Sequence, residues 1–186
     1  LATALGALGR RSGATLYMTL LAAFQTLLHR YTGGVDVSVA CPVAGRAHED
    51  ADGLIGFFVN IVVLRTDLSG NPTFEELLAR TRDGALGAFA HQEMPFEWLV
   101  EELRPERDTS RNPFASVMFE MSDVSGGALQ LDGVQVERIL PAPGATWFDV
   151  EAHAWATGRE IELHFAYDAD LFDEATIARM AAHYER

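Results

Sequence analysis

Three short segments carry polar side chains that a purely structural role does not readily explain. Asn60 lies between apolar residues, and a buried amide must either find hydrogen-bond partners or face a cavity. His91 and Gln92 lie in a turn just ahead of Pro95, and residues 107–113 are dense in hydrogen-bonding groups. Such amide, imidazole and guanidinium groups can orient a substrate through hydrogen bonds. Taken alone, each segment is also typical of a capped turn or a satisfied polar group in the core.

The usual catalytic and metal-binding signatures are missing from the sequence. No Gly-rich phosphate loop follows a predicted strand, no Gly-x-Ser-x-Gly motif occurs, and the single cysteine, Cys41, has no histidine near it. The six histidines are scattered without the spacing of metal ligands, so no metal site is predicted.

Composition restricts the possible partners. The chain has 186 residues, 48% of them hydrophobic, which is enough to bury the core of one domain. A formal net charge of −13 argues against nucleic acid as a ligand. The apolar runs are far shorter than the ~20 residues of a membrane helix, and no secretory signal is visible at Leu1. We therefore expect a cytoplasmic protein that binds neither nucleic acid nor membrane.

Capping residues and a 3.6-residue repeat of apolar positions predict four helices. Thr15 and Asp173 can each cap a helix, and Thr73 with Glu76 forms a capping-box pattern. The predicted helices run from Thr15 to Gly33, from Thr73 to Phe89, from Pro95 to Leu103 and from Asp173 to Tyr184.

Alternating apolar and polar residues predict the strands. Residues 57–64 are nearly all apolar, which indicates a central strand covered on both faces and interrupted by Asn60. About six strands and four helices in mixed order give the α/β class, with a mixed β-sheet and helices packed on it. The other predicted strands are residues 35–39, 116–121 and 134–140 and the hairpin 148–154 with 161–167.

In this order, the three polar segments resemble the fifth, sixth and seventh core motifs of the condensation domains of nonribosomal peptide synthetases. The family patterns are Ile/Val-Gly-x-Phe-Val-Asn-Thr, His/Asn-Gln-Asp-x-Pro-Phe-Glu and Arg-Asp-x-Ser-Arg-Asn-Pro. This chain departs from them with Ile61 in place of Thr and Glu93 in place of Asp. The resemblance also includes residues 41–46 and 170–173, so it spans essentially the whole chain.

The resemblance implies one lobe of a chloramphenicol-acetyltransferase-like fold, that of the CoA-dependent acyltransferases. Condensation domains have two such lobes, and their catalytic motif, two adjacent histidines followed by three residues and Asp-Gly, lies in the first. Residues 1–186 contain no such pair. We therefore expect the chain to be the carboxy-terminal lobe, without catalytic residues of its own and inactive without the amino-terminal lobe.

The resemblance also implies the reaction and the partners. Condensation domains form an amide between an aminoacyl or peptidyl thioester donor and an aminoacyl acceptor. Each is carried on the phosphopantetheine arm of a peptidyl carrier protein, one upstream and one downstream. No cofactor is expected to bind the lobe itself. This chemistry belongs to antibiotic biosynthesis and secondary metabolism.

Two groups of site residues follow from the resemblance. Residues expected to line the substrate tunnel are Gly56, Phe58, Asn60, His91 and Gln92. Asn60 either orients the reacting groups or satisfies buried backbone, and the surface around Phe57 is expected to be an apolar face that meets the amino-terminal lobe. Residues expected to fix a loop by hydrogen bonds are Arg107, Asp108, Ser110, Arg111 and Asn112.

Several alternatives stay open at this stage. The Gly-rich segment 123–135 is either a latch that crosses to the other lobe or an ordinary surface hairpin. The whole chain is either part of an amide-forming enzyme or a non-catalytic module that docks carrier proteins or recruits tailoring enzymes. A free-standing acyltransferase of the same fold, acting on soluble carriers or coenzyme A, is a third possibility.

Overall fold

The computed structural model describes residues 1–46, 49–51, 53–105, 112–123, 132–134, 145–156 and 160–186. Within these residues the chain forms five α-helices, five β-strands and one short 3-10 helix, Glu49–Ala51. The helices are α1 (Ala2–Arg11), α2 (Leu16–Thr32), α3 (Phe74–Ala90), α4 (Phe96–Leu103) and α5 (Glu174–Tyr184). The strands are β1 (Asp36–Val43), β2 (Asn60–Asp67), β3 (Val117–Asp123), β4 (Val150–Ala156) and β5 (Ile161–Tyr167).

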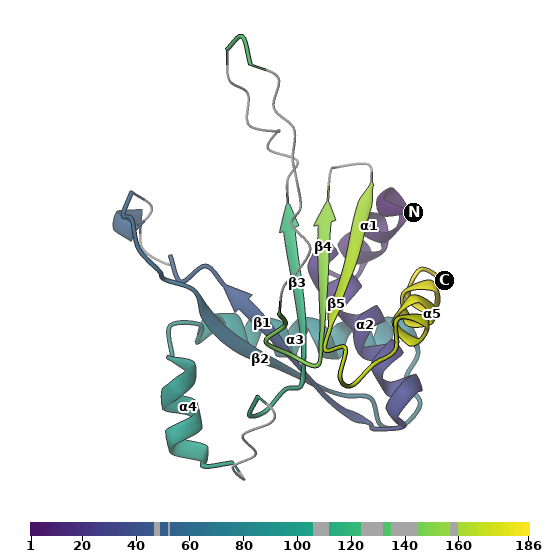
Figure 1. The fold of residues 1–186 in the computed structure, drawn as a ribbon. Helices are drawn as coiled ribbons and strands as arrows, with labels where there is room; N and C mark the ends of the chain where they lie inside the picture. The colour runs from purple at the N-terminus through teal and green to yellow at the C-terminus, as the bar shows by residue number, and fades with distance from the viewer. Residues whose placement is uncertain (47–48, 52, 106–111, 124–131, 135–144, 157–159) are drawn as a thin grey trace.

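The strands form one mixed sheet in the order β2-β1-β3-β4-β5. The pairs β1–β2 and β4–β5 are antiparallel, whereas β1–β3 and β3–β4 are parallel. Strands β1 and β3 are in register only at Ala40 and Met118, while β3 and β4 pair along seven residues. The sheet therefore splays between β1 and β3, and Figure 1 shows β1 and β2 turning away from the other three strands.

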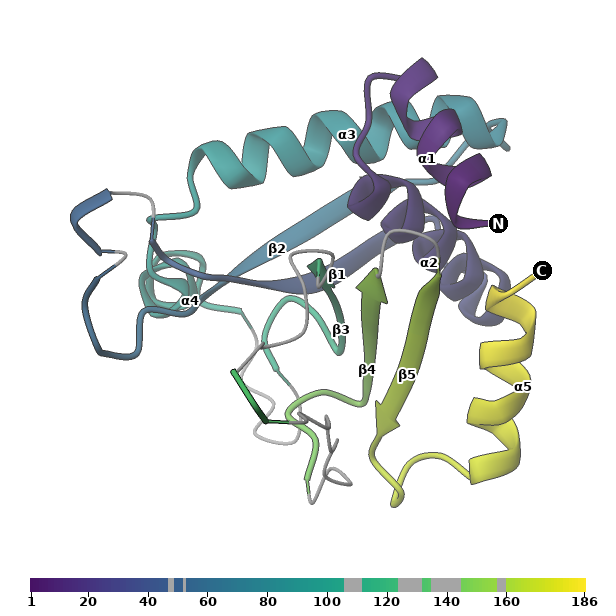
Figure 2. The same ribbon diagram turned by 90° about the horizontal axis from the view of Figure 1, so that it is seen from above.

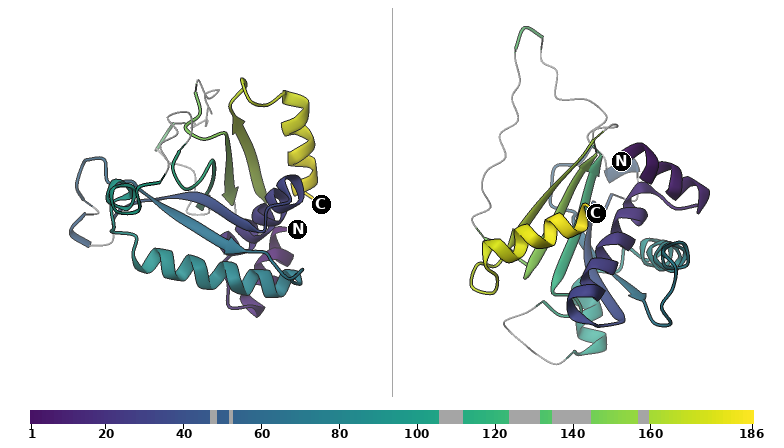
Figure 3. Two further views of the ribbon diagram at one scale, coloured as in Figure 1. Left: turned by 90° about the horizontal axis from the view of Figure 1, so that it is seen from below. Right: turned by 90° about the vertical axis from the view of Figure 1, so that its right-hand side faces the viewer.

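The helices cover the sheet and enclose the main core. Helix α2 packs on β1 and β3, α3 packs on β2, and α5 packs on β5. Figure 2 shows α3 running alongside β2, and the right-hand view of Figure 3 shows α1, α2 and α3 on the same side of the strands. The fully buried Phe24 of α2 lies 5.4 Å from Phe119 and 6.0 Å from Tyr184, measured between ring centroids. None of the described helices is long and apolar enough to cross a bilayer.

Most of the predicted elements are confirmed. Thr15 and Thr73 cap α2 and α3 with reciprocal side-chain and backbone hydrogen bonds. The predicted hairpin is β4–β5, with His153 opposite His164. The mixed sheet with helices packed on it confirms the predicted fold class. The predicted strand 134–140, apart from Val134, lies outside the described residues, as do most of the Gly-rich stretch and the choice between a latch and a hairpin.

One predicted strand was wrong in two respects. The strand expected at 57–64 starts only at Asn60, and it lies at one edge of the described sheet instead of at its centre. Asn60 is therefore the first residue of β2 and not an interruption within it. Helix α1 was not predicted, although Leu5 and Leu8 pack against the main core.

Candidate functional site

Asn60 joins the beginning of β2 to the turn between α3 and α4. Its side-chain nitrogen Nδ2 donates hydrogen bonds to the backbone carbonyls of Gln92, at 2.8 Å, and Met94, at 2.7 Å. Its oxygen Oδ1 accepts a hydrogen bond from the backbone N–H of Phe96 at 3.1 Å. Both N–H groups of the amide are used, so the side chain satisfies backbone groups, as one of the two sequence interpretations proposed.

Phe114, the residue directly after the third motif segment, contacts the second segment. The rings of Phe96 and Phe114 meet edge to face, with centroids 6.1 Å apart. Phe114 has a φ of 70°, a left-handed conformation that is unusual for a bulky residue. Close to it in the sequence, the Asn112 side chain donates a hydrogen bond to the Trp147 carbonyl. Contacts thus run from Asn60 through Phe96 to Phe114, the residue directly after the third segment, while Asn112 contacts Trp147.

The remaining predicted site residues lie around this junction. His91 is exposed at the C-cap of α3, whereas Gln92 is half-buried and lines a pocket. Gly56 is exposed, and Phe58 is half-buried in the loop that precedes β2. The other residues predicted to fix the third segment lie outside the described part of the chain: Arg107, Asp108, Ser110 and Arg111.

Arg46 organises the loop between β1 and β2. Its guanidinium carbon lies 4.4 Å from the centre of the Phe58 ring, a cation–π contact. The same guanidinium donates hydrogen bonds to the carbonyls of Ala51 and Leu54. Gly45 has a φ of 64°, and a side chain there would collide with the Phe58 carbonyl oxygen. Sequence reasoning missed this role of Arg46, although a lone arginine flanked by small residues after a strand was a usable signal.

An exposed apolar surface adjoins the junction. Phe57 is 89% exposed in the loop before β2, and Trp98 is 63% exposed on α4. Ile55, Val59 and Met94 are also exposed. All five lie within five residues of Asn60 or Phe96 in the sequence, and exposed apolar side chains that gather in one region can form an interaction surface. The apolar character expected around Phe57 is therefore present.

A pocket of about 680 Å³ opens where β1 and β3 splay apart. Tyr17 and Met18 of α2 form one wall, and Leu86 and Phe89 of α3 form another. The remaining lining residues come from the loop and from the strands: Thr15, Cys41, Pro42, Val43, Ala44, Val59, Gln92, Glu120 and Met121. Gln92 and Val59 connect this pocket to the Asn60 junction.

Glu120 and His153 form an ion pair beside the pocket. Nδ1 of His153 lies 3.2 Å from Oε2 of Glu120, and Nε2 lies 3.3 Å from Oε2 of Glu151. The hydrogen bond from His153 lowers the pKa of Glu120, and the bond to Glu120 raises the pKa of His153. Glu120 is therefore held in its ionised form. Among the described residues, no three His, Cys, Asp or Glu side chains are grouped so that they could hold a metal ion.

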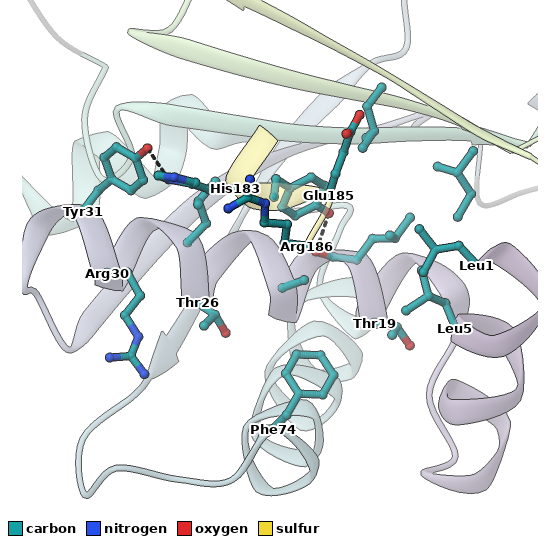
Figure 4. A pocket seen from close by; sticks show the side chains of 16 residues that line it. Leu1, Leu5, Thr19, Thr26, Arg30, Tyr31, Phe74, His183, Glu185 and Arg186 are labelled. Atoms are coloured by element: carbon teal, nitrogen blue, oxygen red, sulfur yellow. Dashed lines mark hydrogen bonds between the residues drawn. The ribbon is translucent and has the colours of Figure 1, made fainter. Parts of the chain in front are cut away.

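A larger pocket of about 860 Å³ lies elsewhere, between α1, α2, α5 and β5 (Figure 4). There the Tyr31 hydroxyl forms a 2.9 Å hydrogen bond with His183, and Leu1 and Arg186 form part of the wall. None of the predicted tunnel residues lines it. Size alone therefore does not identify the site, and the motif residues point to the smaller pocket.

The mixed sheet and its helices are those of a chloramphenicol-acetyltransferase-like fold. The condensation domain from Monacolin K polyketide synthase MokA matches with a TM-score of 0.85 at 23% identity, over 98% of this chain and 42% of that one. The X-domain from teicoplanin biosynthesis matches with a TM-score of 0.84 at 28% identity, over 97% of this chain and 42% of that one. An X-domain complex with OxyB is also similar, at 27% identity. These likenesses define an α/β unit with the fold of condensation domains.

The family follows from sequence comparison. The Condensation domain family model matches residues 1–186. A component of the linear gramicidin synthase of Brevibacillus parabrevis is 48% identical over 183 residues, which cover 96% of this chain and 4% of the relative. The chain belongs to the condensation domain family of nonribosomal peptide synthetases.

Proposed function

We propose that residues 1–186 form the carboxy-terminal lobe of a condensation domain and that an amino-terminal lobe with the paired-His motif completes its active site. In the completed domain, the amine of a carrier-bound aminoacyl acceptor attacks the thioester of a carrier-bound aminoacyl or peptidyl donor. An amide forms, and the thiol of the donor carrier's phosphopantetheine arm is released. The isolated chain forms no amide. A cytoplasmic location stays a prediction from the sequence.

The observation that best supports this function is the set of contacts that joins the first two motif segments to Phe114, directly after the third, beside exposed apolar side chains. Asn60, Phe96 and Phe114 connect segments that are far apart in the sequence. Phe57 is exposed next to this junction, where a second lobe would cover it. A reaction between two tethered groups depends first on alignment, because positioning can supply roughly 7–11 kcal/mol of the barrier. A rigid junction at the tunnel wall serves that purpose.

The contacts give Asn60 a positioning role. Its amide is committed to the backbone of residues 92–96, so it acts by fixing the turn and not by touching the substrate. Gln92, which this turn presents to the 680 Å³ pocket, is then the tunnel-wall residue. Phe58 and Gly56 shape the neighbouring loop, and His91 lies at the turn's exposed side.

A recruitment module is the second candidate function. The likeness to the teicoplanin X-domain, which is also solved as a complex with OxyB, favours it. The exposed apolar surface around Phe57 and Trp98 would serve a protein partner equally well.

The two candidates differ in chemistry. The test joins this chain to an amino-terminal lobe that carries the paired histidines, loads two carrier proteins, and follows the consumption of the donor thioester. We expect acceptor-dependent consumption that stops when the paired histidines are replaced by alanine. Consumption that does not depend on those histidines, or none at all from a folded two-lobe domain, would contradict the enzymatic function and leave recruitment.

A further inference from the structure

The pocket between β1 and β3 has the features of a small-molecule site. Its volume of about 680 Å³ lies within the ~300–1,000 Å³ range typical of ligand pockets. Most of its wall is apolar, including Met18, Val59, Leu86 and Phe89. Because the strands splay, the pocket reaches both faces of the sheet. Side chains alternate along a strand, so Glu120 and Met121 approach it from opposite faces.

One polar group in the wall, the Glu120 carboxylate, has unused hydrogen-bonding capacity. The Tyr17 hydroxyl is buried against the Cys41 thiol and is not open to a ligand. Oε2 of Glu120 contacts His153, whereas the one contact of Oε1 with a described residue is a long one, 3.5 Å from the Ser122 hydroxyl. A carboxylate oxygen can accept two hydrogen bonds, so Oε1 is available to a ligand. The Glu120 side chain is 40% exposed and can be reached from solvent.

These groups require a particular ligand chemistry. An apolar wall favours an aliphatic or aromatic body, and an ionised carboxylate at the same site favours a cation. An α-amino group, with an ordinary pKa of about 8, is mostly protonated at pH 7. An aminoacyl group with an apolar side chain combines both features. In amide formation the acceptor is the substrate that must carry a free amine, whereas a peptidyl donor does not.

We propose that this pocket binds the acceptor aminoacyl group, with an apolar side chain against Val59, Leu86 and Phe89 and the ammonium group at Glu120. The inference rests on the proposed function and adds the chemical class of its acceptor. Glu120 binds the acceptor before its amine loses a proton and takes no part in bond formation.

The experiment titrates the isotope-labelled 186-residue chain with three stable acceptor mimics and follows its amide signals by NMR. The mimics are leucinamide, glycinamide, which lacks the side chain, and N-acetylleucinamide, which lacks the charge. We expect leucinamide to shift signals of Met18, Val43 and Met121. Glycinamide should bind at least about tenfold more weakly, from lost apolar burial. N-acetylleucinamide should bind about two- to fivefold more weakly, as for a half-exposed ion pair.

Variants separate the charge from the cavity. Glu120→Gln should abolish the preference for leucinamide over its N-acetyl derivative, whereas Glu162→Gln should leave it unchanged. Glu162 is a matched control because its carboxylate belongs to the same sheet but contacts His164 outside the pocket. Val59→Trp should fill part of the pocket and abolish binding of both leucine compounds.

Equal binding of all three mimics, or shifts confined to residues outside the pocket, would overturn the proposal. Because the three mimics are compared on the unaltered chain, this comparison tests the proposal even if the Glu120→Gln variant does not fold. If the two-lobe domain forms an amide from a leucine acceptor at the same rate with and without Glu120→Gln, the pocket assignment is contradicted and the proposed function is not. Specific leucinamide binding without amide formation in the two-lobe domain would contradict only the proposed function.

Discussion

The Asn60 side-chain oxygen accepts a hydrogen bond from the backbone N–H of Phe96 at 3.1 Å, across 36 positions in the sequence. The amide nitrogen of the same side chain donates to the carbonyls of Gln92 and Met94. One side chain thus fixes the geometry of the turn between α3 and α4. Asn60, from the segment that resembles the fifth core motif, therefore supports the segment that resembles the sixth.

Replacing Asn60 by alanine should destabilise the chain, because three backbone groups lose their partner. We expect the free energy of unfolding to fall by about 1–3 kcal/mol, measured by urea denaturation. Asn60→Asp should destabilise it at least as much, because a carboxylate oxygen would face the carbonyls of Gln92 and Met94. Gln92→Ala is the control, since it keeps the backbone carbonyl. Equal stability of Asn60→Ala and the unaltered chain would contradict the support role.

Replacing Gly45 by alanine should distort the loop before β2. The residue has a φ of 64°, and the added carbon would collide with the Phe58 carbonyl oxygen. We expect a loss of about 2 kcal/mol or more in the free energy of unfolding. Gly53→Ala is a matched control in the same loop, because a side chain there meets open space. If both variants lower the free energy of unfolding by a similarly small amount, the close contact between Gly45 and the Phe58 carbonyl does not restrict the loop, and the prediction is wrong.

Stability should depend on pH through the His153–Glu120 pair. The pKa of His153 is raised above 6.5, so its contribution is complete below that pH and is lost as pH rises through the raised value. The pKa of Glu120 is lowered below 4.5, so its contribution is present above that pH and is lost on further acidification. The pair therefore stabilises the fold most between those two values.

Denaturation of the unaltered chain and of His153→Gln tests this expectation. The difference in stability should be greater at about pH 5.5 than at about pH 8.5. A difference that stays constant or grows toward alkaline pH would rule out stabilisation by the ion pair.

Local sequence signals predicted elements better than their arrangement. The capping patterns at Thr15 and Thr73 identified α2 and α3, because the hydrogen bonds that begin a helix are local. The apolar run after Asn60 suggested a central strand, but β2 is at the edge of the described sheet. Strand order depends on contacts with distant segments, which periodicity does not report. In α1, Gly6 and Gly9 lower helix propensity, so its packing on the core must stabilise it.

The sequence predicted which motif residues belong to the candidate site, but it did not predict how their side chains are oriented or which other residues line the pocket. Asn60 and Gln92 were identified from sequence and lie together, yet the direction of the Asn60 amide required the positions of three carbonyl and amide groups. Tyr17 and Glu120 were not identified, since the pocket that they line exists only because β1 and β3 diverge. No local pattern in the sequence encodes that divergence.

The central claim is that this chain supplies half of an amide-forming site. The most direct measurement is the intact mass of the acceptor carrier protein after incubation with a loaded donor carrier and the two-lobe domain. We expect the acceptor carrier to gain the mass of the donor acyl group when both lobes are present, and to gain nothing with residues 1–186 alone. Acyl transfer by residues 1–186 alone, or an unchanged acceptor mass with a folded two-lobe domain, would contradict the claim.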